Sequence, residues 1–112
     1  MKKNQIIKKN EDFAVILNKG KRIKNNYYSI YYNESKNNLF GISIPTKTGK
    51  AVVRNKIKRQ LKNIIDNNKS SIQIGYDYVI IIRRSILELD FKQRETKFME
   101  LMLKIGEKNE EK

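Results

Sequence analysis

Five polar residues in one basic segment have the types and the spacing to bind phosphate groups. If residues 52–67 form a helix, one side carries Arg54, Asn55, Lys58, Arg59 and Lys62, with Lys56 at the margin. Guanidinium binds phosphate in a bidentate fork, and the asparagine amide can donate and accept towards a 2′-hydroxyl or a base edge. Only Asp66 offsets these cations within the segment, so few ion pairs along the helix can neutralise them. We therefore favour phosphate binding over a merely solvated charged face.

A second set of side chains has the types needed to stack with unpaired bases. Tyr27 and Tyr31 share one face of the predicted strands with Leu39, and Phe13 and Leu17 belong to a predicted helix beside that face. Together they can line a shallow groove for single-stranded nucleic acid. Alternatively, Phe13 and Leu17 simply pack the small helix onto the sheet, and both interpretations stay open. The phenol of Tyr31 needs water or a polar partner, which favours a binding role.

Groups that could catalyse hydrolysis are sparse. The chain has no cysteine and no histidine, so it has no thiol nucleophile, no Cys-based zinc site and no imidazole proton shuttle. Asp77, Glu88 and Asp90 flank an apolar run without forming the cluster of acids that two Mg²⁺ ions require. Gly49 before Lys50 does not make a phosphate-cradling loop. The sequence predicts a place to hold a polyanion and no place to cut it.

The charge of the whole chain agrees with a polyanionic partner. The 112 residues contain 25 Lys and Arg against 12 Asp and Glu, a formal net charge of +13. Such an excess attracts nucleic acid. An anionic membrane surface is the competing partner, but no apolar run approaches the roughly 18–20 residues that span a bilayer, and no signal peptide is visible. We expect a cytoplasmic protein that does not contact a membrane.

Hydrophobic periodicity predicts six elements that position these residues. Three-to-four-residue spacing predicts helices, alternation and β-branched runs predict strands, and Asp90 is expected to cap the last helix. The expected elements are a helix over 11–19, strands over 27–32 and 39–44, a helix over 52–67, a strand within 75–84 and a helix over 90–105.

The two early strands are predicted to form a β-hairpin because residues 33–38 are turn-forming. Its core face would carry Tyr28, Ile30, Tyr32, Phe40, Ile42 and Ile44, and its other face Tyr27, Ser29, Tyr31, Leu39, Gly41 and Ser43. The order α-β-β-α-β-α, with an additional short strand in the loops, predicts a two-layer α+β sandwich. We expect a single domain over residues 1–112, with a core of about 6–105 and a frayed tail at 106–112.

Four segments resemble the bacterial ribonuclease P protein family, and they occur in the family's order. The basic segment 50–61, KAVVRNKIKRQL, is similar to the family's signature helix, which is a specific motif. Residues 7–13, 39–44 and 75–83 resemble its first helix, its third-strand region and its buried late strand. The resemblance covers about residues 6–105.

The resemblance implies an α/β sandwich whose basic helix lies in an unusual left-handed β-α-β crossover. It also implies a protein subunit that binds a catalytic RNA. In this division of labour the RNA, with Mg²⁺ ions held mainly by the RNA subunit and the substrate, hydrolyses precursor tRNA, and the protein alone binds no Mg²⁺. One protein per catalytic RNA is expected. Matched position by position, Arg54, Asn55, Lys56, Lys58, Arg59 and Lys62 would contact the catalytic RNA, and Phe13, Leu17, Ser29 and Tyr31 would form the cleft for the single-stranded 5′ leader.

Some residues depart from the family pattern. Lys56 replaces the usual second arginine of the motif, which keeps the charge and loses the bidentate fork. Leu17 and Ser29 are smaller or less aromatic than the cleft often carries. We therefore expect the grip on the leader to depend more on Phe13 and Tyr31.

Three other functions compete with this interpretation. A ribosomal or other general RNA-binding protein would share the charge without needing a leader cleft. A sequence-specific DNA-binding protein is disfavoured because no helix-turn-helix pair or dimer zipper is visible. An autonomous nuclease is the least favoured because no catalytic set is visible.

Overall fold

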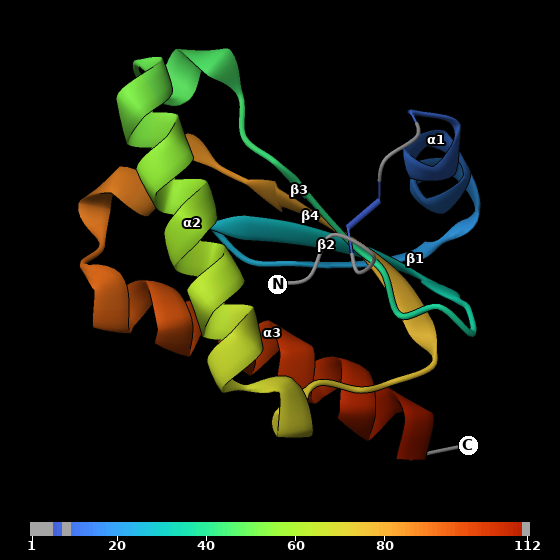
Figure 1. Cartoon of the computed structure of the whole chain (residues 1–112). Coiled ribbons are helices and arrows are strands. Elements are labelled where there is room, and N and C mark those ends of the chain that lie inside the picture. Colours follow the sequence, from blue (N-terminus) through green and yellow to red (C-terminus); the bar gives the residue numbers. More distant parts are fainter. Residues whose placement is uncertain (1–5, 8–9, 111–112) are drawn as a thin grey trace.

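The computed structural model describes residues 6–7 and 10–110, and only the backbone of residues 10, 12 and 106–110. Three helices and four strands follow one another along the chain (Figure 1). They are α1 Asn10–Lys19, β1 Lys21–Lys24, β2 Tyr28–Glu34, β3 Phe40–Ser43, α2 Ala51–Asn67, β4 Tyr76–Ile82 and α3 Phe91–Glu110. The six predicted elements are confirmed, and β1 is the additional short strand.

The strands form one sheet in the order β1-β2-β4-β3. The predicted hairpin between residues 27–32 and 39–44 is wrong, because β4 lies between β2 and β3 and the hairpin joins β1 to β2. The physical reason is burial on both faces. Val79 and Ile80 of β4 are each 0% exposed, so this apolar strand needs a neighbour on either side. The alternation of apolar side chains along the early strands predicts which face each side chain occupies, but it does not predict which strands pair.

The helix α2 connects two parallel neighbours. β3 and β4 pair in parallel, and α2 lies between them in the sequence, which makes the predicted β-α-β crossover. Parallel strands need a long connection because the chain must return to the opposite end of the sheet before the second strand begins, and a tight turn cannot span that distance. Residues 44–50, which include the short 3₁₀ helix Thr46–Thr48, connect the end of β3 to α2. The basic helix therefore begins close to the edge strand β3. The left-handed sense of the crossover stays a prediction.

The main core lies between the sheet and the helices α2 and α3 (Figure 1). Tyr28, Ile30 and Tyr32 of β2 point into it with 2%, 0% and 3% exposure, as their alternation predicts. The ring of Tyr28 meets that of Phe98 from α3 edge to face, with centroids 5.5 Å apart. Such burial supplies most of the stability of a chain this polar. The prediction for Tyr27 is wrong, because its side chain packs against this core and not on the opposite face.

The short helix α1 covers part of the opposite face of the sheet, which we call the second face. Ile16 of α1 and Val79 of β4 are buried there together with Ile7, and Phe13, Tyr31, Leu39 and Ile81 pack around them. Close approach requires Gly41 on β3, because a Cβ at this position would lie 2.6 Å from Cζ of Phe13. The prediction that α1 lies on this face is confirmed.

The carboxylates of Asp77 and Asp90 accept hydrogen bonds from backbone N–H groups. Asp90 Oδ1 accepts a hydrogen bond from the backbone of Gln93 at 2.8 Å, and Gln93 Oε1 accepts from the backbone of Asp90 at 3.0 Å, so the predicted cap on α3 is confirmed. Asp77 Oδ1 accepts from the backbone of Leu39 at 2.8 Å. These carboxylates therefore have structural partners.

Two further expectations concern the ends of the chain and the membrane. The backbone of α3 is helical as far as Glu110, and fraying of residues 106–112 stays a prediction, as does the single domain over residues 1–112. Among the described residues, none of the helices combines the length and the apolar character that a bilayer span requires.

Candidate nucleic-acid interface

The helix α2 separates an apolar stripe from a cationic face. Its buried residues recur every three or four positions and are Ile57, Leu61, Ile64 and Ile65. Asn55, Lys56 and Arg59 are exposed on the other side. Arg54, Lys58 and Lys62 are half-buried at its margins. The predicted division of the helix into two faces is confirmed. Lys56, which was expected at the margin of the cationic side, is fully on it, and Arg54, Lys58 and Lys62 take the marginal positions.

The half-buried cations have distinct surroundings. Nε of Arg54 donates a hydrogen bond to the carbonyl of Gly49 at 3.1 Å, which holds the start of α2 against the preceding loop. Lys58 and Lys62 instead border the space between α2 and β3. These two lysines therefore face a groove as well as the outer surface of the helix.

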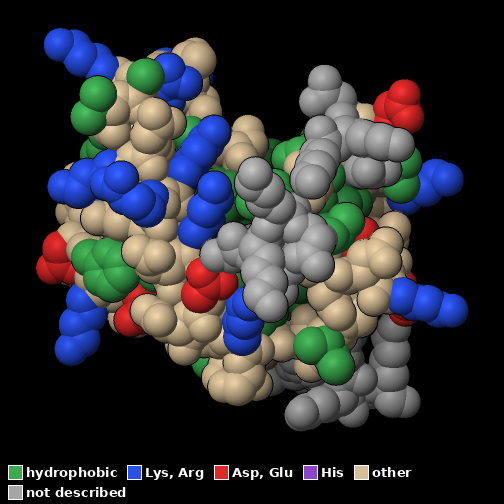
Figure 2. Space-filling model, in the orientation of Figure 1, with side chains coloured by type: hydrophobic (Ala, Val, Ile, Leu, Met, Phe, Trp, Pro, Cys, Tyr) green, Lys and Arg blue, Asp and Glu red, His purple; other side chains and the backbone are tan. Residues whose placement is uncertain are grey.

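Lysine and arginine side chains gather over α2 in the space-filling view (Figure 2). Among the described residues, the observed ion pairs are Lys69 with Asp66 at 3.6 Å and Lys97 with Glu100 at 3.8 Å. Neither pair involves a predicted site residue, and the first turn of α2 contains no acidic side chain. The cationic face is therefore available to phosphate groups.

A groove runs between α1 and α2 along the edge of β3, and we call it the central groove. One hollow in it has a volume of about 450 Å³, and a neighbouring one about 200 Å³. Phe13, Ile42 and Lys58 line both hollows. The first is completed by Ala14, Leu17, Ser43 and Ile44, and the second by Ile6, Ile7, Phe40, Gly41 and Lys62. Tertiary structure thus brings residues of the two predicted sites together.

Phe13 fits both interpretations left open by the sequence, since its side chain packs α1 onto the sheet and also lines the groove. Its ring packs over Gly41 and is only partly exposed, so it anchors α1 on the sheet. The same ring lines both hollows. Leu17, one helical turn further along, is 38% exposed beside Ser43. Both side chains offer apolar surface on which a base can stack.

Tyr31 and Ser29 lie on the second face but do not line the central groove. Tyr31 pairs with Val79 and Ser29 with Ile81, so β4 separates both from β3. Two strand spacings amount to about 10 Å. The expectation that Tyr31 sits next to Leu39 depended on the hairpin and is corrected with it. The four predicted cleft residues share a face but form two groups, with Phe13 and Leu17 at β3 and Ser29 and Tyr31 at β2.

Two exposed cations beside Tyr31 and Ser29 were not identified from the sequence. Arg22 and Lys24 belong to β1, where they pair with Tyr31 and Ser29. The guanidinium carbon of Arg22 lies 6.0 Å from the centroid of the Tyr31 ring. The alternating segment KRIK at 21–24 was the available signal, since its single apolar residue, Ile23, is buried. Without the strand order, nothing indicated that these cations face the predicted cleft.

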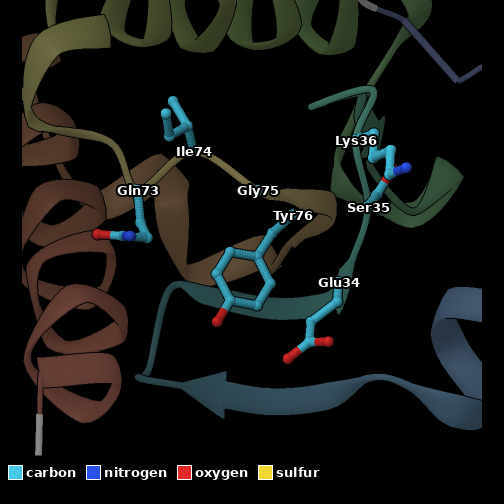
Figure 3. Close-up of a pocket in the computed structure, with 7 residues that line it drawn as sticks. All are labelled: Glu34, Ser35, Lys36, Gln73, Ile74, Gly75 and Tyr76. Atoms are coloured by element: carbon cyan, nitrogen blue, oxygen red, sulfur yellow. The ribbon is translucent and has the colours of Figure 1, made fainter.

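A hollow larger than those of the central groove lies elsewhere, between the β2–β3 turn and the loop before β4 (Figure 3). It has a volume of about 620 Å³ and is lined by Glu34, Ser35, Lys36, Gln73, Ile74, Gly75 and Tyr76. One acid and one cation do not make a catalytic set or a polyanion site. Across the part of the chain that is described, no three acidic, cysteine or histidine side chains converge as a metal site would require.

Ionisable groups with altered pKa values lie in the main core. Burial raises the pKa of the Tyr28 and Tyr78 phenols well above the ordinary value of 10.0. The pKa of Tyr32 is also raised, mainly by burial and to a smaller extent by the neighbouring phenol of Tyr76. The hydroxyls of Tyr28 and Tyr78 donate to the carbonyls of Arg94 and Gln73. These groups support the fold and lie away from the central groove.

The family model, the relatives and the solved structures that this chain resembles agree on one family. Residues 1–106 match the family model described as Ribonuclease P. The ribonuclease P protein component of Streptococcus agalactiae is 38% identical over 104 residues, which cover 91% of this chain and 94% of the relative. The RNase P proteins of Staphylococcus aureus and Thermotoga maritima have solved structures that match with TM-scores of 0.82 in both cases. They are 34% and 30% identical, with coverage of 93% and 88% of this chain and 96% of each structure.

Proposed function

The chain belongs to the bacterial ribonuclease P protein family, and from that premise we propose how its surface serves a ribonucleoprotein endoribonuclease. The cationic face of α2, formed by Arg54, Asn55, Lys56, Lys58, Arg59 and Lys62, binds the catalytic RNA. The second face, with Phe13, Leu17, Ser29 and Tyr31, receives the single-stranded 5′ leader of precursor tRNA. The holoenzyme removes this leader to form the mature 5′ end.

One observation carries this proposal: the central groove borders the cationic face. Lys58 belongs to that face and lines both hollows beside Phe13. An RNA bound along α2 would therefore lie next to a groove with apolar surface for stacking. Phosphates hold a nucleic acid in register, whereas stacking on aromatic side chains selects unpaired bases. This pairing of surfaces suits a protein that positions an unpaired leader beside a structured RNA.

Hydrolysis in this proposal belongs to the RNA partner. Mg²⁺ ions held mainly by the catalytic RNA and the substrate supply the activated water, and the protein alone binds none. The protein contributes positive charge and orientation, which lower the Mg²⁺ concentration needed to hold two RNAs together. We further propose one protein per catalytic RNA and a cytoplasmic complex.

Reconstitution tests the proposal directly. The full chain, freed of RNA by nuclease treatment and repurified, is combined with a bacterial ribonuclease P RNA and precursor tRNA at low Mg²⁺. We expect cleavage at the mature 5′ end by the complex and none by either component at that Mg²⁺ concentration. Cleavage by RNA-free protein would contradict the division of labour. RNA binding without any stimulation of cleavage would instead favour a general RNA-binding protein.

A further inference from the structure

The second face continues past Tyr31 and Ser29 to β1, the edge strand farthest from β3. Strand pairing places Arg22 beside Tyr31 and Lys24 beside Ser29. Side chains alternate along a strand, so these two cations share the second face. Lys21 and Ile23 point the other way, and Ile23 is buried at 9% exposure in the main core. One short strand thus presents two cations to the second face and one to the opposite face.

Both cations are available to a ligand. Arg22 and Lys24 are exposed, and within the described part of the chain neither forms an ion pair. The contact of Arg22 with the Tyr31 ring orients its guanidinium on the face without neutralising it. Lys24 is also exposed, and among the described residues no ring contact of its side chain is observed.

An uncovered row of residues leads from these cations to the central groove. Lys24 pairs with Ser29, Ser29 with Ile81, and Ile81 with Ser43, which borders the larger hollow. The adjacent row is covered, since Val79 is 0% exposed and Gly41 lies under Phe13. In contrast, Ser43 is exposed, and Ser29 and Ile81 are half-buried. The uncovered row therefore forms a path across the sheet.

The width of that path suits a short piece of single-stranded RNA. Three strand spacings of about 4.8 Å separate β3 from β1, or roughly 14 Å in total. A strand stacked at about 3.4 Å per nucleotide crosses this distance with about four nucleotides. A leader that lies in the central groove and continues across the sheet would reach Arg22 and Lys24 only if it is long enough.

We propose that Arg22 and Lys24 form a second phosphate-binding site, which takes the backbone of leader nucleotides beyond those held in the central groove. The proposal rests on the proposed function, because it requires the leader to lie on the second face. Its ligand is the phosphodiester backbone of single-stranded RNA. Contacts with phosphates carry no direct sequence information, so this site favours long leaders over short ones regardless of their sequence.

The test compares leader lengths in the reconstituted holoenzyme. Precursor tRNAs with leaders of about two and about ten nucleotides are bound by complexes containing the wild type or the double variant Arg22→Gln/Lys24→Gln. We expect affinity for the long leader to fall about tenfold at 0.1 M salt, and its log–log salt slope to fall by about 1.4, since each phosphate contact on a single strand contributes about 0.7. Affinity for the short leader should not change.

Matched variants separate this effect from general loss of charge. Lys21→Gln removes a cation from the opposite face of the same strand and should leave both affinities unchanged. Lys24→Gln alone removes no contact seen in the structure and should lower the long-leader slope by about 0.7. Circular dichroism establishes that each variant is folded.

Two outcomes overturn the proposal. Equal losses with both leaders would place the cations against the catalytic RNA or the tRNA body, and an unchanged long-leader affinity would leave them as solvated side chains. Tyr31→Ala, measured in parallel, separates the two levels of inference. If Tyr31→Ala weakens long-leader binding and the double variant does not, only this second site is wrong. If neither does, the assignment of the leader to the second face is wrong as well.

Discussion

At the scale of single residues, Phe13 and Gly41 form a matched pair. The ring of Phe13 lies on the part of β3 where the missing side chain leaves room for it, and the same ring lines the central groove. The position of a residue proposed to bind the leader therefore depends on the space that a glycine leaves beneath it. Changes at Gly41 should affect both folding and binding.

Gly41→Val tests that dependence. A Cβ would lie 2.6 Å from Phe13 Cζ, so the ring must move, and overpacking of this kind costs about 1–3 kcal/mol. We expect a lower free energy of unfolding in urea and weaker binding of precursor tRNA by the holoenzyme. Gly49→Ala is the control, because its new Cβ would meet Val53 at an ordinary 3.4 Å. Equal stability of the Gly41 variant and the wild type would show that Phe13 does not need this close approach.

Tyr31 offers a test of the proposed leader surface. In the holoenzyme, Tyr31→Ala should weaken binding of precursor tRNA and leave mature tRNA binding nearly unchanged, because only the precursor has unpaired 5′ nucleotides. The loss of one stacking contact costs roughly 1–3 kcal/mol. Tyr31→Phe keeps the ring and should keep most of the affinity. The measurement is the ratio of precursor to mature affinity at fixed Mg²⁺ and salt, and a parallel fall in both affinities would assign Tyr31 to the RNA-subunit interface or the core.

At the scale of elements, α2 makes contacts of opposite kinds on its two sides. Burial of Leu61 and Ile64, at 2% and 1% exposure, attaches one side to the sheet and α3. The cations on the other side make little contribution to that packing. Their removal should therefore affect RNA binding much more than stability.

The variant Arg54→Ala/Lys58→Ala/Arg59→Ala tests this separation. Each lost phosphate contact lowers the log–log salt slope of RNA binding by about 0.7–0.9, so three contacts predict a decrease of roughly 2–3. Circular dichroism should report a folded protein. Because Arg54 also donates to Gly49, Lys58→Ala/Arg59→Ala is measured beside the triple variant. Lys92→Ala/Lys104→Ala on α3 is the control for charge, and an unchanged slope in the folded triple variant would leave the basic side of α2 as a solvated face.

At the scale of the whole molecule, the core is rich in tyrosine. Burial raises the pKa of the Tyr28 and Tyr78 phenols, whose hydroxyls bond to backbone carbonyls. In the unfolded chain these phenols ionise near 10, whereas in the folded protein they stay protonated at that pH. The native state then holds more protons than the unfolded state, so stability falls as pH rises above about 10.

Tyr28→Phe should reduce that loss. The variant lacks one raised phenol, so its free energy of unfolding should decrease less than that of the wild type between about pH 9.5 and 11.5. At neutral pH, losing the hydrogen bond to Arg94 should cost about 0.5–1.5 kcal/mol. Urea unfolding across this pH range measures both effects. The variant keeps every other ionisable group, so the difference between variant and wild type isolates Tyr28, and identical pH dependence would contradict its role.

The elements, and the faces that depend on local periodicity, could be predicted from the amino-acid sequence. The apolar stripe of α2 and the alternation of Tyr28, Ile30 and Tyr32 predicted which side chains are buried, and Asp90 predicted the start of α3. These signals survive because burial follows from the repeat of a helix or a strand, whatever its partners are. The basic segment was recognisable for the same reason, because its cations lie on consecutive turns of one helix.

The identity of neighbouring elements could not be predicted in this way and follows from the fold. Placement of β4 between β2 and β3 separates Tyr31 from the central groove, and the crossover through α2 brings Lys58 beside Phe13. It also puts Arg22 and Lys24 on the same face as Tyr31. Strand order depends on how non-local surfaces are buried together, and alternation is satisfied equally by several orders. For this reason the residues of the proposed RNA surface could be found from the sequence, whereas their arrangement into a groove and a path across the sheet could not.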